Sequence, residues 1–454
     1  MAQAPDPDAT WHAELAWLGG DRPAAQVTIQ AAAGAIVAVT PDSEPPVDAV
    51  RLRGLTLPGL ANPHSHALHR ALRGRTQTSA TDFWAWRALM YELVARLDPD
   101  SLHRLARATY AEMALAGVTA VGEFHYLHHG HDGAPYANPN AMGEALIAAA
   151  SEAGIRLTLI DSCYLWGGLG DTPLEGAQRR FGDADATAWA DRVTALEGVP
   201  GVELAAAVHS VRAVDECSMA VVRDWARARG APLHVHASEQ LRENDECRAA
   251  TARTPIGLLA HAGVLGPSTT VIHATHVSDA DIEQLGSSRT QVCLCPTTER
   301  DLGDGIGPAR ALAAAGCALT VGSDMHATID LFEELRAVEL DQRLLIGRRG
   351  IHDPAALLEM ATTAGMSSIG QDSSGIAVGG TADLVTVRMD SPRTAGADPA
   401  QAVFALSAAD VTDVVVAGRP IVRDGRHLTI PDVGAELAAA IEPLMRRQPA
   451  LRGA

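Results

Sequence analysis

The chain has 454 residues, of which 47% are hydrophobic, and carries a formal net charge of −19. This length suits one large domain with an accessory domain, and the acidic balance argues against nucleic acid or an anionic membrane as a partner. The sequence contains no lysine, so all 36 Lys and Arg positions are arginine. A Schiff-base lysine, a phosphate-loop lysine and a carbamylated lysine bridging two metals are therefore excluded.

The six cysteines have neither the density nor the spacing of a disulfide scaffold. Cys293 and Cys295 alternate as on a buried strand, and no second pair follows to complete a zinc knuckle. Residues 1–10 lack the basic start and apolar core of a signal peptide, and no apolar stretch is long enough to span a bilayer. We therefore expect a cytoplasmic protein with reduced thiols.

Both ends of the chain show strand-like alternation and glycine turns. Strands are expected at residues 25–39, 47–53, 382–388, 411–416 and 420–422, with a hairpin turn at 417–419. We predict that residues 1–56 and 376–430 together form a small β-sandwich domain. Residues 431–454 are expected to form a C-terminal helix and tail, with the helix at 433–447.

Between these segments, short apolar strands alternate with amphipathic helices. The predicted strands cover residues 57–62, 119–124, 156–161, 202–208, 232–237, 270–274, 291–295 and 318–322. The predicted helices include residues 82–96, 101–116, 141–153, 186–196 and 218–229. Eight parallel strands with intervening helices close into a barrel, so the sequence predicts an α/β fold with a (β/α)8 TIM-like barrel over residues 57–375.

Four of these predicted strands end in residues that bind metals. His64 and His66 follow the first, His236 lies near the end of the fifth, His273 near the end of the sixth, and Asp324 follows the eighth. Active sites of such barrels are built where the strands end, and two positions along a strand place both imidazoles on one side. Three neutral imidazoles and one carboxylate suit a divalent ion with a position left open for water. The ion lowers the pKa of that water towards about 7, so hydrolysis is the expected reaction.

Glu239 follows His236 by three residues, close enough to share the site without ligating the ion. A carboxylate there can move protons between the attacking water and the leaving group. The alternative interpretation is a carboxylate at the start of a helix.

Four sequence runs resemble the amidohydrolase superfamily, in its deaminase-like branch with one metal: residues 62–67, 236–239, 273–276 and 322–324. The resemblance implies one divalent ion, with zinc expected and iron as the alternative. The metal ligands that it implies are His64, His66, His236 and Asp324. The catalytic residues that it implies are Glu239, His273 and Asp324. The absence of lysine agrees with a single-metal site.

Further segments resemble one family within that superfamily, N-formimidoyl-L-glutamate deiminase: residues 83–87, 123–129, 209–214 and 302–305. The similarity runs through about residues 55–345 and is weak in the terminal strands. That family acts in histidine degradation and hydrolyses N-formimidoyl-L-glutamate to N-formyl-L-glutamate and ammonia. The resemblance implies attack by metal-bound hydroxide on the formimidoyl carbon, and a homodimer.

The substrate of that family carries two carboxylates, so its recognition requires guanidinium groups in an otherwise acidic chain. The substrate-binding residues that the resemblance implies are His69, Arg87, Tyr126, His209 and Arg212. His69 stands where some members have glutamine, and both side chains can donate a hydrogen bond. For Arg87, a solvated helix arginine is an equally good interpretation.

Two other functions stay open. A deaminase or chlorohydrolase-like enzyme acting on a heterocycle such as guanine or an aminotriazine would favour aromatic stacking, which an aromatic content of 4% supports weakly. A non-catalytic metal-binding barrel would be expected to lose its proton-transfer residues, yet Glu239 and His273 are both present.

Overall fold

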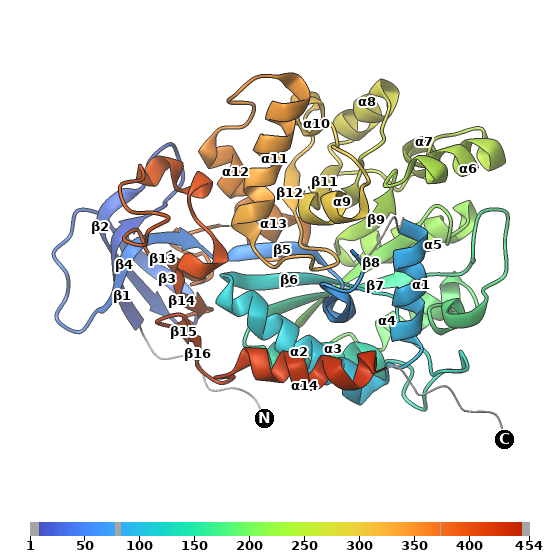
Figure 1. Ribbon diagram of the computed structural model, residues 1–454, viewed down its shortest axis with the longest axis horizontal. Coiled ribbons are helices and arrows are strands. Elements are labelled where there is room, and N and C mark those ends of the chain that lie inside the picture. Colours follow the sequence, from blue (N-terminus) through green and yellow to red (C-terminus); the bar gives the residue numbers. More distant parts are fainter. Residues whose placement is uncertain (1–8, 78–82, 373, 447–454) are drawn as a thin grey trace.

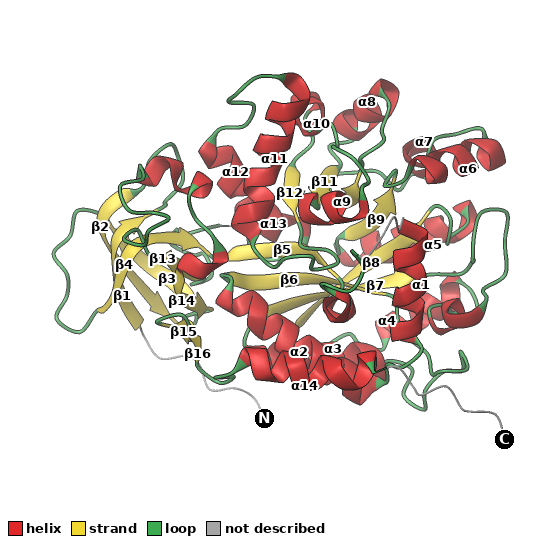
Figure 2. Ribbon diagram, in the orientation of Figure 1, coloured by secondary structure: helices red, strands yellow, loops and turns green. Residues whose placement is uncertain are grey.

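The computed structural model describes residues 9–77, 83–372 and 374–446. Within these ranges the strands form two eight-stranded sheets. One is a parallel barrel built from the middle of the chain, and the other is assembled from both ends of the chain beside it (Figures 1 and 2). No helix in the described ranges is long and apolar enough to cross a membrane.

The barrel strands follow one another around the sheet in chain order. They are β5 (Leu60–Ser65), β6 (Val118–His125), β7 (Arg156–Cys163), β8 (Val202–Ser210), β9 (Leu233–Ala237), β10 (Thr269–His273), β11 (Gln291–Leu294) and β12 (Leu319–Val321). Neighbouring strands are parallel, and a parallel bridge between Ser65 and Asp324 closes the ring between its two ends. The predicted fold class is confirmed.

The closure of the barrel depends on a glycine in the turn after β12. A Cβ atom at Gly322 would lie 2.8 Å from both the Cβ and the main-chain oxygen of His64. The main-chain nitrogen of Asp324 donates to the oxygen of His64 at 3.0 Å, and that of His66 donates to the oxygen of Asp324 at 3.0 Å. Main-chain hydrogen bonds therefore hold these three residues together.

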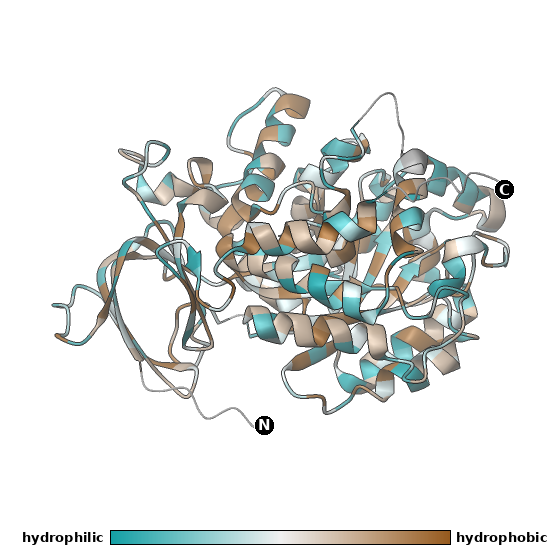
Figure 3. Ribbon diagram, turned by 60° about the horizontal axis from the view of Figure 1, so that its bottom comes forward, coloured by the Kyte–Doolittle hydropathy of each residue, from teal (hydrophilic) through white to brown (hydrophobic). Residues whose placement is uncertain are grey.

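Helices surround the barrel and carry both hydrophilic and hydrophobic residues, as expected for elements with one buried face (Figure 3). The first eight are α1 (Phe83–Val94), α2 (Pro99–Leu115), α3 (Ala141–Ala153), α4 (Ala186–Thr194), α5 (Glu216–Arg229), α6 (Leu241–Thr251), α7 (Pro255–His261) and α8 (Asp279–Ser287). The others are α9 (Pro296–Leu302), α10 (Ala309–Ala315), α11 (Leu331–Ile346), α12 (Pro354–Met360), α13 (Thr363–Ser368) and α14 (Val433–Met445). Residues 82 and 447, predicted as helix ends, lie outside the described ranges.

The second sheet joins the two ends of the chain. Its strands are β1 (Ala9–Ala16), β2 (Ala24–Ala32), β3 (Ala35–Thr40), β4 (Val50–Pro58), β13 (Leu384–Val387), β14 (Val411–Val416), β15 (Arg419–Arg423) and β16 (Arg426–His427). Strands β13 and β4 pair antiparallel, which joins the C-terminal strands to the N-terminal ones. Buried side chains such as Trp11, Ile29 and Leu384 form a core cluster of this sheet, separate from the barrel core.

The prediction of the first barrel strand at residues 57–62 was wrong, because two elements meet there. Strand β4 ends at Pro58, which pairs with Leu384 of the terminal sheet. Strand β5 begins at Leu60, which pairs with Val118 of the barrel. The end of β4 and the whole of β5 are buried, so the apolar run continues across the junction and hides the boundary.

Candidate active site

The four predicted metal ligands meet at the carboxyl ends of β5, β9 and β12. The Oδ1 atom of Asp324 lies 3.1 Å from Nε2 of His64 and 3.4 Å from Nε2 of His66. The Nε2 atoms of His64 and His236 are 3.2 Å apart. An ion with bonds of about 2.0–2.1 Å places neighbouring ligand atoms roughly 3 to 3.5 Å apart, so these spacings fit one ion.

Two of the imidazoles are held in the form that binds metals. The Nδ1 atoms of His66 and His236 contact the main-chain oxygens of Phe124 and His209, both at 3.0 Å. A carbonyl oxygen only accepts, so each Nδ1 carries the proton and each Nε2 presents a lone pair. Two lone pairs and a carboxylate oxygen therefore face one another at short distance, an arrangement that a bound cation stabilises.

Burial and the neighbouring imidazoles hold the pKa of His64, His66 and His236 well below the usual value, which keeps these ligands neutral. Burial alone would raise the pKa of Asp324, but the imidazoles around it, first His273, lower it. The cluster therefore consists of neutral imidazoles around one carboxylate, the ligand set of a divalent cation.

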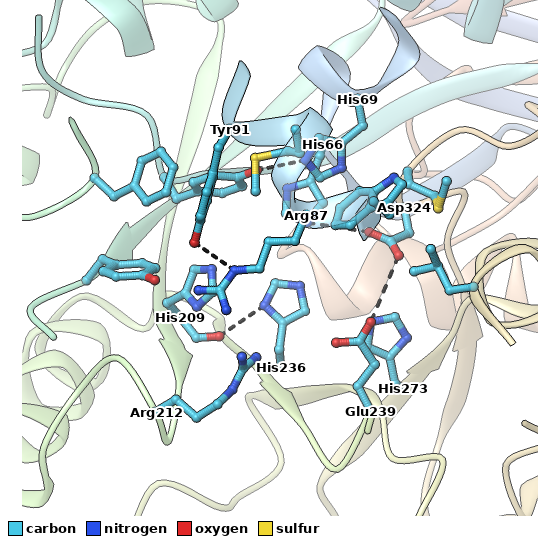
Figure 4. A pocket seen from close by; sticks show the side chains of 17 residues that line it. His66, His69, Arg87, Tyr91, His209, Arg212, His236, Glu239, His273 and Asp324 are labelled. Atoms are coloured by element: carbon cyan, nitrogen blue, oxygen red, sulfur yellow. Dashed lines mark hydrogen bonds and ion pairs between the residues drawn. The ribbon is translucent and has the colours of Figure 1, made fainter. Parts of the chain in front are cut away.

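Glu239 and His273 lie beside this cluster (Figure 4). The Nε2 atom of His273 is 3.8 Å from Oε1 of Glu239 and 3.9 Å from Oδ2 of Asp324. On its other side, His273 places Nδ1 3.4 Å from Oε1 of Glu299, a buried carboxylate that also accepts from the main-chain nitrogen of Cys295 at 2.9 Å. Two groups able to transfer protons therefore flank the ligand set.

The predicted substrate-binding residues line the same cavity. They are His69, Arg87, Tyr126, His209 and Arg212. His69 Nε2 and the Tyr126 hydroxyl are 2.7 Å apart, so the histidine that replaces glutamine is hydrogen-bonded to another predicted residue. Arg87 and Arg212 reach into the cavity from α1 and from the loop after β8 (Figure 4). The structure thus brings the predicted substrate-binding residues together with Glu239 and His273, and His64 lies beneath them, fully buried.

Several residues around the arginines were not predicted. The Nε atom of Arg87 donates to the Tyr91 hydroxyl at 2.7 Å, and Nε of Arg212 lies 3.6 Å from Oε1 of Glu243. Glu243 also accepts from the main-chain nitrogen of Glu239 at 3.3 Å. Tyr91 follows Arg87 by four residues on α1, a spacing that places both on one helix face. Glu243 lies in the first turn of α6, just after the loop that carries Glu239.

Aromatic side chains also line the cavity: Trp86, Tyr91, Tyr126, Tyr164 and Phe181. The low aromatic content of the whole chain therefore does not disfavour stacking with a ligand, because these residues are concentrated at the site. They supply apolar walls around the two guanidinium groups.

A second cluster of possible ligands comprises His125, His128 and Asp161. Arg192 donates to both carboxylate oxygens of Asp161 at 2.9 Å, and Trp189 donates to it at 3.0 Å. This carboxylate already has a cationic partner, so the cluster is explained by hydrogen bonding inside the barrel wall.

Comparisons with known proteins agree with this geometry. The amidohydrolase family model matches residues 55–421. A formimidoylglutamate deiminase of Pseudomonas aeruginosa is 38% identical, covering 87% of this chain and 90% of the relative. A 5-methylthioadenosine/S-adenosylhomocysteine deaminase of Natronomonas pharaonis is 28% identical over 84% of each chain. The crystal structure of an amidohydrolase from Brucella melitensis superposes with a TM-score of 0.89 at 33% identity, covering 96% of this chain and 100% of that one.

Proposed function

The chain belongs to the amidohydrolase family, and on that basis we propose that it hydrolyses N-formimidoyl-L-glutamate to N-formyl-L-glutamate and ammonia. The observation that carries the proposal is the presence of Arg87 and Arg212 in one cavity with Glu239 and His273. A dicarboxylate with a reactive nitrogen group needs this combination, because guanidinium groups pair with carboxylates while the other two residues transfer protons.

The metal-ligand set supports one divalent ion, held by His64, His66, His236 and Asp324, and we propose zinc. Iron is the alternative, since it accepts the same ligands. When bound, such an ion supplies the Lewis acidity that lowers the pKa of a water towards about 7.

Substrate binding in this proposal begins with the carboxylates. Arg87 and Arg212 bind them, and the hydroxyl of Tyr126 and the imidazoles of His69 and His209 provide further hydrogen-bonding groups on the cavity wall. The formimidoyl group is then directed towards Glu239 and His273 at the other side of the cavity (Figure 4).

The proposed reaction adds water across the formimidoyl C=N bond. Glu239 removes a proton as the water oxygen attacks the carbon, and it returns a proton to the terminal nitrogen. A second proton, that of the attacking oxygen, then passes to the same nitrogen. The bond from carbon to that nitrogen breaks, ammonia leaves and the formyl carbonyl forms. In this proposal His273 stabilises the negative charge that develops on the attacking oxygen, and Asp324 accepts the proton of that oxygen and passes it on towards the nitrogen.

A heterocycle deaminase is the second candidate, because aromatic side chains line the cavity. The two functions are separated by measuring ammonia release from N-formimidoyl-L-glutamate, formimidoylglycine, guanine, an aminotriazine and adenosine. The proposal requires turnover of formimidoylglutamate well above that of the other compounds. Preferential turnover of a heterocycle would replace it with the second candidate. A homodimer and a cytoplasmic location stay predictions from the sequence.

A further inference from the structure

The two arginines of the cavity are held by different partners. Arg212 contacts a carboxylate, Glu243, through Nε. Arg87 donates its Nε hydrogen to a neutral hydroxyl, that of Tyr91, at 2.7 Å, and its guanidinium carbon lies 5.2 Å from the centre of the Tyr91 ring. Both contacts are made by Nε, the guanidinium nitrogen bonded to the side-chain methylene. In each arginine the two terminal nitrogens therefore lie on the side of the guanidinium group away from this contact.

Arg87 and Tyr91 form this contact within one helix. They lie four residues apart on α1, which places them on the same face one turn apart, and both line the cavity. The ring of Tyr91 is in turn packed near Phe181, with ring centres 6.2 Å apart. The long and flexible side chain of Arg87 is thereby restrained by a ring that is itself packed against the cavity wall.

We propose that Tyr91 is a positioning residue that orients Arg87 towards a substrate carboxylate, an inference that rests on the proposed function. The hydroxyl oxygen accepts from Nε and fixes the plane of the guanidinium group, so its terminal nitrogens meet the carboxylate without a further loss of side-chain freedom.

The test uses Tyr91→Phe, Arg87→Met and the double variant, with the full-length enzyme. Tyr91→Phe removes one oxygen and keeps the ring. Binding is measured by calorimetry with N-formyl-L-glutamate, the proposed product, and steady-state rates are measured with N-formimidoyl-L-glutamate. Tyr136→Phe is the matched control, because the Tyr136 hydroxyl contacts Arg180 at 3.4 Å and neither residue lines the cavity.

Tyr91→Phe is expected to weaken N-formyl-L-glutamate binding and to raise KM, each by about tenfold, with kcat within about twofold of the parent value. In the Arg87→Met background the same change should alter binding by less than about twofold, because the residue that Tyr91 positions is already gone. Tyr136→Phe should bind as the parent does. A loss of folding would instead lower the melting temperature and kcat together.

Parental binding and KM in Tyr91→Phe would overturn the inference. An equal loss of binding in both backgrounds would also overturn it, since the hydroxyl would then contact the ligand directly. A parent enzyme that binds N-formyl-L-glutamate but releases no ammonia from the formimidoyl compound contradicts the proposed function, while the binding cycle still decides the role of Tyr91. If the parent enzyme neither binds N-formyl-L-glutamate nor hydrolyses N-formimidoyl-L-glutamate, both proposals are overturned.

Discussion

His236 donates its Nδ1 hydrogen to the main-chain oxygen of His209 across 3.0 Å. This hydrogen bond joins a proposed metal ligand on β9 to a proposed substrate-binding residue on β8. It fixes the imidazole of His236 with Nε2 towards the ligand cluster, and it fixes the main chain that carries the His209 ring at the cavity wall. The proposed metal site and the proposed substrate site therefore share one structural support.

The purified protein is expected to contain about one divalent ion per chain, because the ligand atoms of His64, His66, His236 and Asp324 are spaced for a single ion. Elemental analysis of protein prepared without added metal measures this. The double variant His64→Ala, His236→Ala should lose the ion, whereas His103→Ala, at a more exposed histidine paired with Glu152, should keep it. Two stoichiometric ions, or metal retained by the double variant, would contradict the single-metal site.

Glu239→Gln is expected to lower kcat by about 100-fold or more, since general acid–base groups contribute about 100- to 10,000-fold. Metal content should stay at the parental level, because Glu239 lies beside the ligand cluster and is not part of it. Glu283→Gln, at an exposed position on α8, serves as the control for this substitution. If Glu239→Gln kept more than about a tenth of the parental rate, proton transfer by this residue would be ruled out.

Arg212→Met is expected to cost about 2 to 5 kcal/mol in kcat/KM, because a substrate carboxylate would lose its cationic partner in a largely desolvated cavity. Selectivity should fall as well. Comparing formimidoylglutamate with formimidoylglycine and with an α-amide analogue identifies the carboxylate that Arg212 binds. Arg248→Met, at a half-exposed arginine on α6, is the control. Parental selectivity against both analogues would make Arg212 a structural residue.

Asp161 is expected to stabilise the fold except in strong acid. Burial alone would raise its pKa, but the Arg192 guanidinium lowers the pKa of Asp161 from 3.8 to about 2. The folded-state value is below the unfolded one, so the contribution is present above about pH 4 and is lost as the pH falls towards 2. When the pH is lowered from 6 to 2.5, the free energy of unfolding should decrease in both proteins. The decrease should be smaller in Asp161→Asn than in the parent, by about 2 kcal/mol.

The quantity compared in that experiment is the change of unfolding free energy with pH. Its absolute value near neutral pH should also be lower in Asp161→Asn, because this variant leaves Arg192 with one fewer carboxylate. Asp245→Asn, at an exposed aspartate, should keep the parental slope. Equal slopes in all three proteins would show that the Asp161 pair does not control acid stability.

The sequence was sufficient to predict the barrel and the gathering of the predicted metal ligands at one end of it. The barrel strands are short and apolar and alternate with amphipathic helices, and His236, His273 and Asp324 stand where such strands end. The barrel topology then brings these strand ends to one face, so residues far apart in the chain could be placed together before any distance was known.

Other features depend on contacts that periodicity does not encode. Glu299 reaches His273 from the start of α9, and Glu243 reaches Arg212 from α6. Predicting either contact requires the rotation of a helix relative to its neighbouring strand. The boundary between β4 and β5 was missed for a different reason, because Pro58 and Leu60 are both buried, in different sheets.

The bridge between Ser65 and Asp324, which joins β5 to the end of β12, also determines when the ligand site can form during synthesis. His64 and His66 leave the ribosome early, but Asp324 and the strand that pairs beside them arrive only after the rest of the barrel has been made. A nascent chain can therefore offer an ion an incomplete set of ligands until the ring closes. We therefore expect the protein to bind its metal only after the barrel is complete. A protein that holds the metal on all four ligands is then one whose barrel has closed correctly.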